Sequence, residues 1–308
     1  MMGTKPKLFT DLTLLARAVR APFLTASTVP VLVGCSAAYY ETGCFSFLLF
    51  LLTLVGVVSL HCGANVVNDY YDYLSGADPS HHPYPFHGGS QLLQAGLVTN
   101  KQVQYLYCFF FLLATACGLC LLLTRGAIIL FFGGTGIFFG YYYTAPPLKF
   151  AYRGLGELVT GITFGPLSVL GTYYVQTQTS SYSAFLASLP LGFLITAVLY
   201  VNQFSDSPED RAAGKNNLVV QLGNRAARPG LILLFTGAYF SLLLSANHGF
   251  LPHTTLLALL TLPLAAICSW YIYHYYDYPE KLAPASLTVI ASHTGTGILL
   301  SLGYLLGI

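Results

Sequence analysis

The sequence predicts an all-α membrane protein with about nine transmembrane helices. Of its 308 residues, 55% are hydrophobic and only 8% are charged, whereas about 25% of the residues in an ordinary soluble domain carry a charge. Apolar stretches close to the roughly 20 residues that span a bilayer recur along most of the chain. This composition excludes an ordinary soluble protein and predicts a single integral-membrane domain over residues 1–308.

The first half of the chain contains four of the predicted spans. A basic, partly amphipathic segment, residues 5–20, comes first and is expected to lie at the membrane interface. The four spans are predicted at residues 22–40, 45–68, 104–123 and 126–143. A polar loop, residues 69–100, separates the second span from the third, and loops of this length often serve as lids or binding loops.

The second half contains five further spans. They are predicted at residues 155–175, 184–202, 229–246, 254–273 and 283–305. Spans one to four (about residues 20–145) and five to eight (about residues 155–274) form a predicted internal repeat, followed by an extra ninth helix. Because an offset of four spans is even, the two halves have the same direction in the membrane. The repeat is therefore expected to be parallel, unlike the inverted repeats of many transporters.

The positions of lysine and arginine predict that the N-terminus is cytoplasmic. With that orientation, Arg125 is the one residue among the 13 lysines and arginines that lies in an outside segment, as the positive-inside rule requires. A missed helix would disturb this alternation, so the charges also support nine spans. No cleavable signal peptide is expected. We expect an integral protein of a bacterial inner membrane whose two long, charged loops face the cytoplasm.

Two clusters of amides and carboxylates lie where apolar segments end. The first consists of Asn65, Asn68, Asp69 and Asp72. The second consists of Asn202, Asp206 and Asp210. Within each cluster the spacing places the side chains on one face of a helix. One acid at a helix end often marks only the interface, but ionisable groups in spanning segments are usually functional, and two clusters with matching offsets predict a site.

The chemistry of these clusters indicates a metal and a diphosphate. Facing carboxylates bind an anion poorly unless a cation lies between them, and Mg²⁺ is held by one or two carboxylates together with substrate phosphates. Helix C-termini also favour cations. Basic residues that could bind oxyanions lie beside the clusters: Arg20, Lys149, Arg153, Arg211 and Lys215. Because most of the chain is in lipid, the expected ligand is a diphosphate with a long apolar tail.

The clusters and their loops contain three motifs: Asn68-Asp69-x-x-Asp72, Gly88-Gly89-Ser90 and Asn202-x-x-x-Asp206-x-x-x-Asp210-Arg211-x-x-Gly214-Lys215. Together they resemble the signatures of the UbiA superfamily of intramembrane prenyltransferases. The resemblance covers nearly the whole chain. Residues 68–78, 154–177 and 214–223 are most similar to the MenA-like branch, which acts on 1,4-dihydroxy-2-naphthoate. In the superfamily, the first motif often has an acid eight residues after its asparagine. In this chain that position is Gly76, and the acid, Asp78, comes two residues later. The MenA-like branch shares this displacement.

The resemblance implies a central cavity among the nine helices, polar at its cytoplasmic end and open toward lipid. It implies two Mg²⁺ ions bridged by the diphosphate, with these protein ligands: Asn68, Asp72, Asn202, Asp206 and Asp210. The asparagines Asn68 and Asn202 would also support the substrate. The metal would stabilise the charge on the departing diphosphate, helped by cationic side chains: Arg20, Lys149, Arg211 and Lys215.

The implied reaction is Mg²⁺-dependent transfer of a polyprenyl group to an aromatic acceptor. The allylic carbocation must be kept from water, and Tyr143 with Tyr142 are the candidates to stabilise it by cation–π contact. The expected acceptor is 1,4-dihydroxy-2-naphthoate, which loses its carboxylate as CO₂. The predicted catalytic residues are Asp72, Asp206 and Lys149, with Asp69 or Asp78 as candidates to assist deprotonation or orient the acceptor.

Other functions are compatible with parts of the pattern. The acceptor could instead be 4-hydroxybenzoate or homogentisate. A cation-coupled transporter would use intramembrane aspartates, but here the acids lie at helix ends and not at the midplane. A lipid-binding scaffold would not need two intact acid clusters, and nucleic acid is not an expected partner. The loop histidines His81, His82 and His87 have zinc-like spacing without an evident fourth ligand, and their role stays open.

Overall fold

The computed structural model describes residues 11–78 and 89–308, and every regular element in these ranges is a helix. Eight helical segments of the described chain are long and apolar enough to cross a membrane. A ninth apolar helix, α5 (Ile128–Tyr142), has 15 residues. The all-α membrane fold is therefore confirmed, with one of the nine predicted spans shorter than expected.

The first half begins with a short helix at one end of the molecule. This helix, α1 (Leu12–Ala18), is capped by the carboxylate of Asp11, which accepts hydrogen bonds from the next backbone amides. The elements that follow are η1 (Ala21–Phe23), α2 (Thr25–Thr42), α3 (Phe47–Ser75), α4 (Asn100–Arg125) and α5.

The second half starts with a span in three parts. These are α6 (Gly156–Ile162), a π-helical turn η3 (Thr163–Leu167) and α7 (Ser168–Thr177), and Pro166, which has no amide hydrogen, lies inside the turn. A short helix, η2 (Phe150–Arg153), comes before α6. The elements after α7 are α8 (Tyr182–Ala212), α9 (Leu218–Leu222), α10 (Asn224–Asn247), η4 (His253–Thr261), α11 (Leu262–Tyr275), η5 (Pro279–Lys281) and α12 (Ala283–Leu306).

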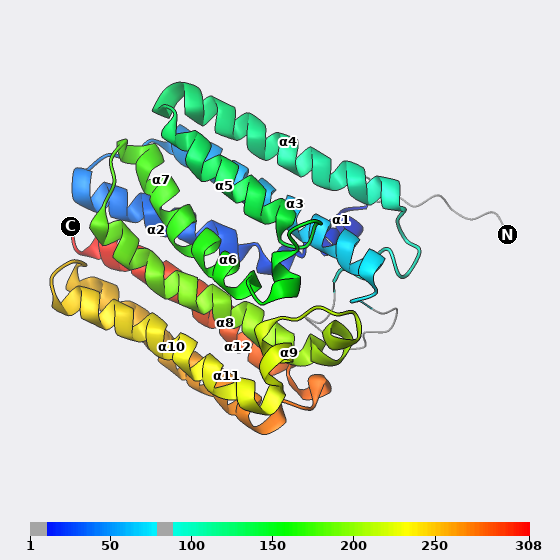
Figure 1. Cartoon of the computed structure of the whole chain (residues 1–308). Helices are drawn as coiled ribbons and strands as arrows, with labels where there is room; N and C mark the ends of the chain where they lie inside the picture. The colour runs from blue at the N-terminus through cyan, green and yellow to red at the C-terminus, as the bar shows by residue number, and fades with distance from the viewer. Residues whose placement is uncertain (1–10, 79–88) are drawn as a thin grey trace.

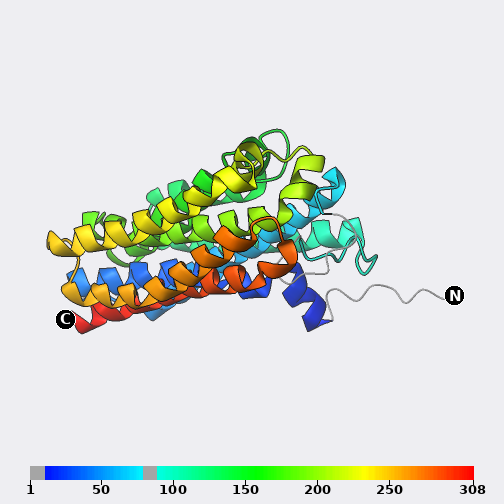
Figure 2. The same cartoon turned by 90° about the horizontal axis from the view of Figure 1, so that it is seen from below.

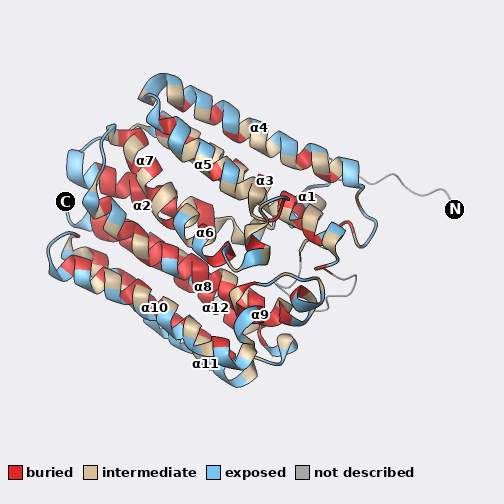
Figure 3. Cartoon of the chain, in the orientation of Figure 1, coloured by how far each residue is buried: buried red, intermediate tan, exposed pale blue. Residues whose placement is uncertain are grey.

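The long helices form one bundle with α8 at its centre (Figures 1 and 2). Helices α10, α11 and α12 lie on one side of α8, and α2, α6 and α7 lie on the other, with α3, α4 and α5 beyond them. Colouring by burial shows α8 mostly buried, whereas α4 and α10 present exposed faces to the outside (Figure 3). These exposed faces carry large apolar side chains such as Leu123 and Leu233, as expected of a surface in contact with lipid.

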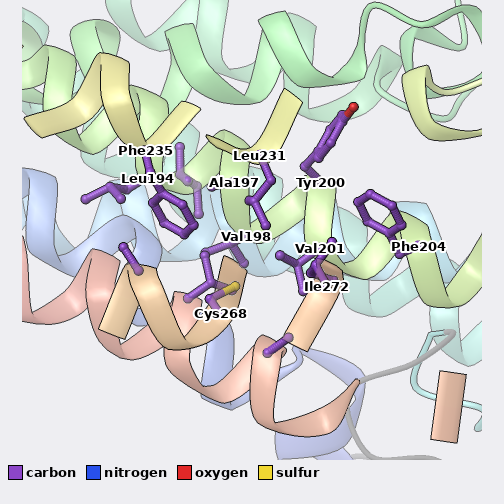
Figure 4. Close-up of a cluster of buried hydrophobic side chains, with 14 of the residues drawn as sticks. Leu194, Ala197, Val198, Tyr200, Val201, Phe204, Leu231, Phe235, Cys268 and Ile272 are labelled. Atoms are coloured by element: carbon purple, nitrogen blue, oxygen red, sulfur yellow. The ribbon is translucent and has the colours of Figure 1, made fainter. Parts of the chain in front are cut away.

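The largest hydrophobic core packs α8 against α10, α11 and α12 (Figure 4). Leu194, Val198 and Val201 of α8 meet Leu231 of α10 and Ile272 of α11, and all five are buried. The opposite face of α8 is thereby left to the cavity described below.

The two acid-bearing helices extend further than the sequence predicted. Helix α3 continues to Ser75 and α8 continues to Ala212, so the loops predicted to begin at residues 69 and 206 begin later. Polar residues with helical spacing can extend a helix beyond its apolar part, where the helix end meets water. The aspartates of both clusters are therefore fixed on helices, and both helices end at the same end of the bundle (Figure 1).

Candidate active site

A cavity of about 1030 Å³ lies inside the bundle, lined by residues from α1 to α8. Most of its charged and amide side chains come from the end of the bundle where α3 and α8 terminate, among them Arg20, Asn65, Asn68, Asp72, Asp78, Asn202, Asp206, Asp210 and Lys215. Further along, the wall is largely apolar, and the backbone of α5 approaches the cavity at Gly133, Gly136 and Gly140. The cavity thus combines a polar head region with a long apolar region.

Lys215 connects the two acid clusters. Its Nζ lies 2.9 Å from Asp72 Oδ2 and 3.4 Å from Asp210 Oδ1. Burial lowers the pKa of Lys215, but the charges of Asp72 and Asp210 outweigh that effect and raise the pKa well above its ordinary value. Lys215 therefore stays charged and neutralises carboxylates that would otherwise repel each other in a buried place.

Asp72 accepts hydrogen bonds from three side chains, those of Asn68, Tyr152 and Lys215. Asn68 Nδ2 donates to Asp72 Oδ2 at 2.8 Å, which confirms that these two residues share a helix face. The hydroxyl of Tyr152, from η2, donates to Asp72 Oδ1 at 2.7 Å. Burial, followed by the charge of Asp72, raises the pKa of Tyr152, so the phenol keeps its proton as a donor. This contact could not be predicted, because Tyr152 lies in an aromatic-rich link with no helical spacing to the cluster.

The second cluster is supported by the segment that leads into α9. Asn217 Nδ2 donates to Asp210 Oδ2 at 2.7 Å, and Asn217 Oδ1 caps α9 by accepting from the amide of Val220. Asn202 and Asp206 line the cavity, and Asn202 Oδ1 accepts from Ser286 of α12 at 3.3 Å. Asn217 therefore holds Asp210 in place, a role that the spacing of residues along α8 could not indicate.

Asp69 does not line the cavity, although the sequence placed it on the same face as its neighbours. Its Oδ1 accepts from Arg20 Nε at 3.0 Å and also pairs with Nη2 of that residue, while its Oδ2 accepts from the amide of Ser90 at 2.8 Å. Asp69 thus holds Arg20, which does line the cavity, and the chain at Ser90. This placement gives no support to the predicted role of Asp69 toward the acceptor.

Gly89 lies against the carboxylates of the first cluster. A β-carbon at this position would overlap the side chains of Asp69 and Asp78, so the motif requires glycine there. Gly88, His81, His82 and His87 lie outside the described residues, as do the first two lysines of the chain. The structure therefore accounts for the second glycine of the Gly88-Gly89-Ser90 motif.

Asp78 lies in the cavity wall and is 8% exposed. Within the described chain its Oδ2 has no hydrogen-bond partner. Burial, and then the charge of Asp72, raise the pKa of Asp78 to about 7. A buried carboxylate oxygen without a partner is costly, and it is therefore well placed to bind a cation or a donor group of a ligand.

Two of the predicted cationic residues lie away from the cavity. Lys149 Nζ lies 5.0 Å from the centre of the Tyr152 ring, and Arg211 points to the carbonyl of Val220 at 3.5 Å. Their predicted roles are not supported by these positions. Tyr143 lines the cavity, whereas Tyr142 does not.

The oxygen donors of the site fit Mg²⁺ that is shared with a bound diphosphate. The described ranges contain no group of three or more acidic, histidine or cysteine side chains that could hold a metal ion alone. The available donors are carboxylate and amide oxygens, which Mg²⁺ prefers, and it commonly takes its other ligands from substrate phosphates and water. The unpartnered Asp78 Oδ2 adds one more such oxygen.

Comparisons with known proteins agree with this geometry. The profile of the UbiA prenyltransferase family matches residues 27–291. The chain is 30% identical over 289 residues to 2-carboxy-1,4-naphthoquinone phytyltransferase of Synechocystis, and the alignment covers 93% of this chain and 91% of that protein. It is also 30% identical over 296 residues to 1,4-dihydroxy-2-naphthoate octaprenyltransferase of Escherichia coli, covering 94% of each chain.

A solved structure shows the same fold. It is a UbiA homolog from Archaeoglobus fulgidus bound to DMAPP and Mg²⁺, and it superposes with a TM-score of 0.61 at 17% sequence identity. The superposition covers 96% of this chain and 98% of that one. The family profile, the two relatives and the shared fold lead to one conclusion: the chain belongs to the UbiA prenyltransferase family.

Proposed function

We propose that this protein transfers a polyprenyl group from an isoprenyl diphosphate to 1,4-dihydroxy-2-naphthoate. The observation that carries the proposal is a cavity whose polar end holds carboxylates from two helices joined by Lys215, and whose remaining wall is largely apolar. The polar end suits a diphosphate and the apolar region suits an isoprenoid tail. The choice of acceptor is supported by the relatives, which are named for naphthoate and naphthoquinone substrates.

The residues of the polar end stabilise the leaving group in this proposal. The diphosphate departs with the electron pair of the bond to the allylic carbon, and Lys215 and Arg20 stabilise the charge that develops on it. Five residues would hold Mg²⁺, which we propose as two ions and which would supply Lewis-acid stabilisation of the leaving group: Asn68, Asp72, Asn202, Asp206 and Asp210.

The apolar region protects the cation that remains. Its wall excludes water, which would otherwise capture the allylic carbon. Tyr143 lines the cavity and is the residue that we propose for cation–π contact with the allylic cation. The ring carbon that bears the carboxylate then forms the new bond to the allylic carbon with a pair of ring electrons. The acceptor's carboxylate leaves as CO₂ and returns its bonding electron pair to the ring, so no oxidant or reductant is needed.

The charge distribution supports a cytoplasmic site in a bacterial inner membrane. One basic residue of the described chain, Arg125, lies at the end of the bundle opposite the site, because it is the final residue of α4. The other described basic residues follow the positive-inside rule if the site end is cytoplasmic. Isoprenyl diphosphates could then reach the cavity from the cytoplasm.

Purified protein with labelled geranylgeranyl diphosphate and a panel of aromatic acceptors tests the proposal. We expect a prenylated naphthoquinol only when Mg²⁺ and 1,4-dihydroxy-2-naphthoate are both present. Transfer to 4-hydroxybenzoate or homogentisate instead would keep the reaction and change the acceptor. Folded protein that turns over none of the acceptors would contradict the proposal.

A further inference from the structure

A buried histidine lines the cavity away from the acid clusters. His61 lies on α3 and is 7% exposed, and it belongs to the same face of that helix as Asn65, Asn68 and Asp72. The helical rise places it about 10 Å along the axis from Asn68 and about 16 Å from Asp72. The mechanism proposed above gives this residue no role.

The neighbouring hydrogen bonds fix which ring nitrogen carries the proton. Ser27 Oγ donates its single hydrogen to the carbonyl of Leu24 at 2.9 Å. Ser27 Oγ also lies 3.1 Å from His61 Nδ1, so in that contact it must accept, and Nδ1 must donate. In a neutral imidazole the other nitrogen, Nε2, then presents a lone pair.

The ring is held so that Nε2 is available to the cavity. The ring of Phe164 packs edge-on against the imidazole with 4.7 Å between the ring centres, and Ser27 holds the Nδ1 side. Among the described residues, Nε2 has no hydrogen-bond partner. No acidic side chain hydrogen-bonds this ring in the described chain, and an isolated charge is costly in an apolar span, so the neutral form is favoured.

The chemistry of the substrates decides what Nε2 can bind. An isoprenoid tail has no hydrogen-bonding group, and the diphosphate belongs at the acidic end of the cavity. The aromatic acceptor is the participant with hydroxyl groups, each of which can donate one hydrogen bond. A hydrogen-bond acceptor on the cavity wall therefore matches a ring hydroxyl.

We propose that His61 Nε2 accepts a hydrogen bond from one hydroxyl of the aromatic acceptor. The contact orients the acceptor ring toward the allylic carbon and makes that ring richer in electrons for attack. Ser27 acts through His61 as a positioning residue, because its oxygen selects the tautomer. The inference rests on the proposed function, and it adds the recognition of the acceptor to it.

Steady-state kinetics with each substrate varied separately give the first test. We expect His61→Leu to lower kcat/KM for the acceptor about tenfold and to leave the KM for the diphosphate within about twofold. His61→Gln carries an oxygen acceptor and should recover most of the loss, and Ser27→Ala should lie between wild type and His61→Leu. An equal fall in kcat/KM for the acceptor and for the diphosphate would show that the effect is structural and would overturn the assignment.

The matched control is His293 of α12. It is 1% exposed, and it does not line the cavity. His293→Leu removes a buried imidazole from a spanning helix and should leave kcat/KM for the acceptor unchanged. A loss equal to that of His61→Leu would overturn the assignment.

Equilibrium binding separates this inference from the proposed function, because it needs no turnover. The probes are 1-hydroxy-2-naphthoate and 4-hydroxy-2-naphthoate, each of which lacks one of the two hydroxyls. His61→Leu should weaken binding of the probe that keeps the recognised hydroxyl about tenfold and should leave the other probe unchanged. Equal effects on both probes, or no effect on either, would overturn the role of His61. Failure of wild-type turnover would instead overturn the proposed function.

Discussion

The Nζ of Lys215 lies 2.9 Å from Asp72 Oδ2, although 143 positions separate the two residues in the chain. The same nitrogen lies 3.4 Å from Asp210 Oδ1. A single cation from the segment between α8 and α9 therefore links the acid-bearing ends of α3 and α8. Both carboxylates are buried, so the geometry of the polar end depends on this lysine.

Replacing Lys215 with methionine tests that dependence. Two buried carboxylates would lose their counter-ion, so we expect the free energy of unfolding to fall by about 3 kcal/mol. Transfer activity should fall about 100-fold because the leaving group loses a cation. Lys215→Arg keeps the charge, so it should retain part of the stability and part of the activity. Thermal unfolding and product formation in detergent measure these effects. The control is Lys101→Met, at an exposed residue of α4; equal losses in the two variants would contradict the prediction.

Asparagine in place of Asp72 or Asp206 tests the proposed metal ligands. Each change keeps the side chain's size but removes a charge that would hold Mg²⁺, so we expect activity to fall at least about 100-fold and the required Mg²⁺ concentration to rise. Activity is measured over a Mg²⁺ titration with protein shown to be folded by gel filtration. The control is Asp277→Asn, at a residue that does not line the cavity. Full activity in both Asp72→Asn and Asp206→Asn would refute the metal assignment.

Tyr152→Phe removes the phenol that donates to Asp72. Hydrogen bonds to charged groups contribute about 1.5–3 kcal/mol, so we expect transfer to slow about tenfold with little change in the fold. Initial rates at saturating substrate check this. The comparison variant is Tyr278→Phe, at a residue that is 51% exposed, and it should behave as wild type. If Tyr152→Phe does the same, the phenol has no part in holding the carboxylate.

The raised pKa of Asp78 predicts that the stability of the protein depends on pH. Burial raises its pKa to about 7 in the folded protein, from an ordinary value of 3.8. Between these values the folded state binds a proton more readily than the unfolded state. We therefore expect the free energy of unfolding to fall as the pH rises from about 4 to 7, and to level off above pH 7.

The variant Asp78→Asn cannot titrate and should reduce that slope. Unfolding in denaturant at pH 5.0 and pH 7.5 measures it, with the parent protein in the same detergent as the reference. Identical slopes in the two proteins would show that Asp78 does not titrate in this range.

The sequence could predict the membrane fold because its signals are local. Nine apolar segments and the helical spacing of the two clusters are each contained within about 30 residues, and the positive-inside pattern needs only the order of the charges. The predicted ends of α3 and α8 were wrong, because hydropathy alone was used to set the boundary of each helix. Polar residues with helical spacing were therefore assigned to a loop.

The partners of the acids could not be predicted, because they come from distant parts of the chain. Lys149 and Lys215 look alike in sequence, each in a basic segment after a span, yet only Lys215 reaches the cavity. Tyr152 and Asn217 carry no pattern that connects them to Asp72 and Asp210. Asp69 directly follows Asn68 in the chain. One step along the helix rotates its side chain toward Arg20 and away from the cavity.

The two ends of the described chain lie at opposite ends of the bundle (Figures 1 and 2). Helix α1 is near the site, whereas α12 finishes at the far end, at Leu306. Epitopes fused at the two ends would therefore be separated by the bilayer. A protease added outside sealed vesicles would cut one epitope and spare the other, so a single digestion would report which compartment supplies the diphosphate.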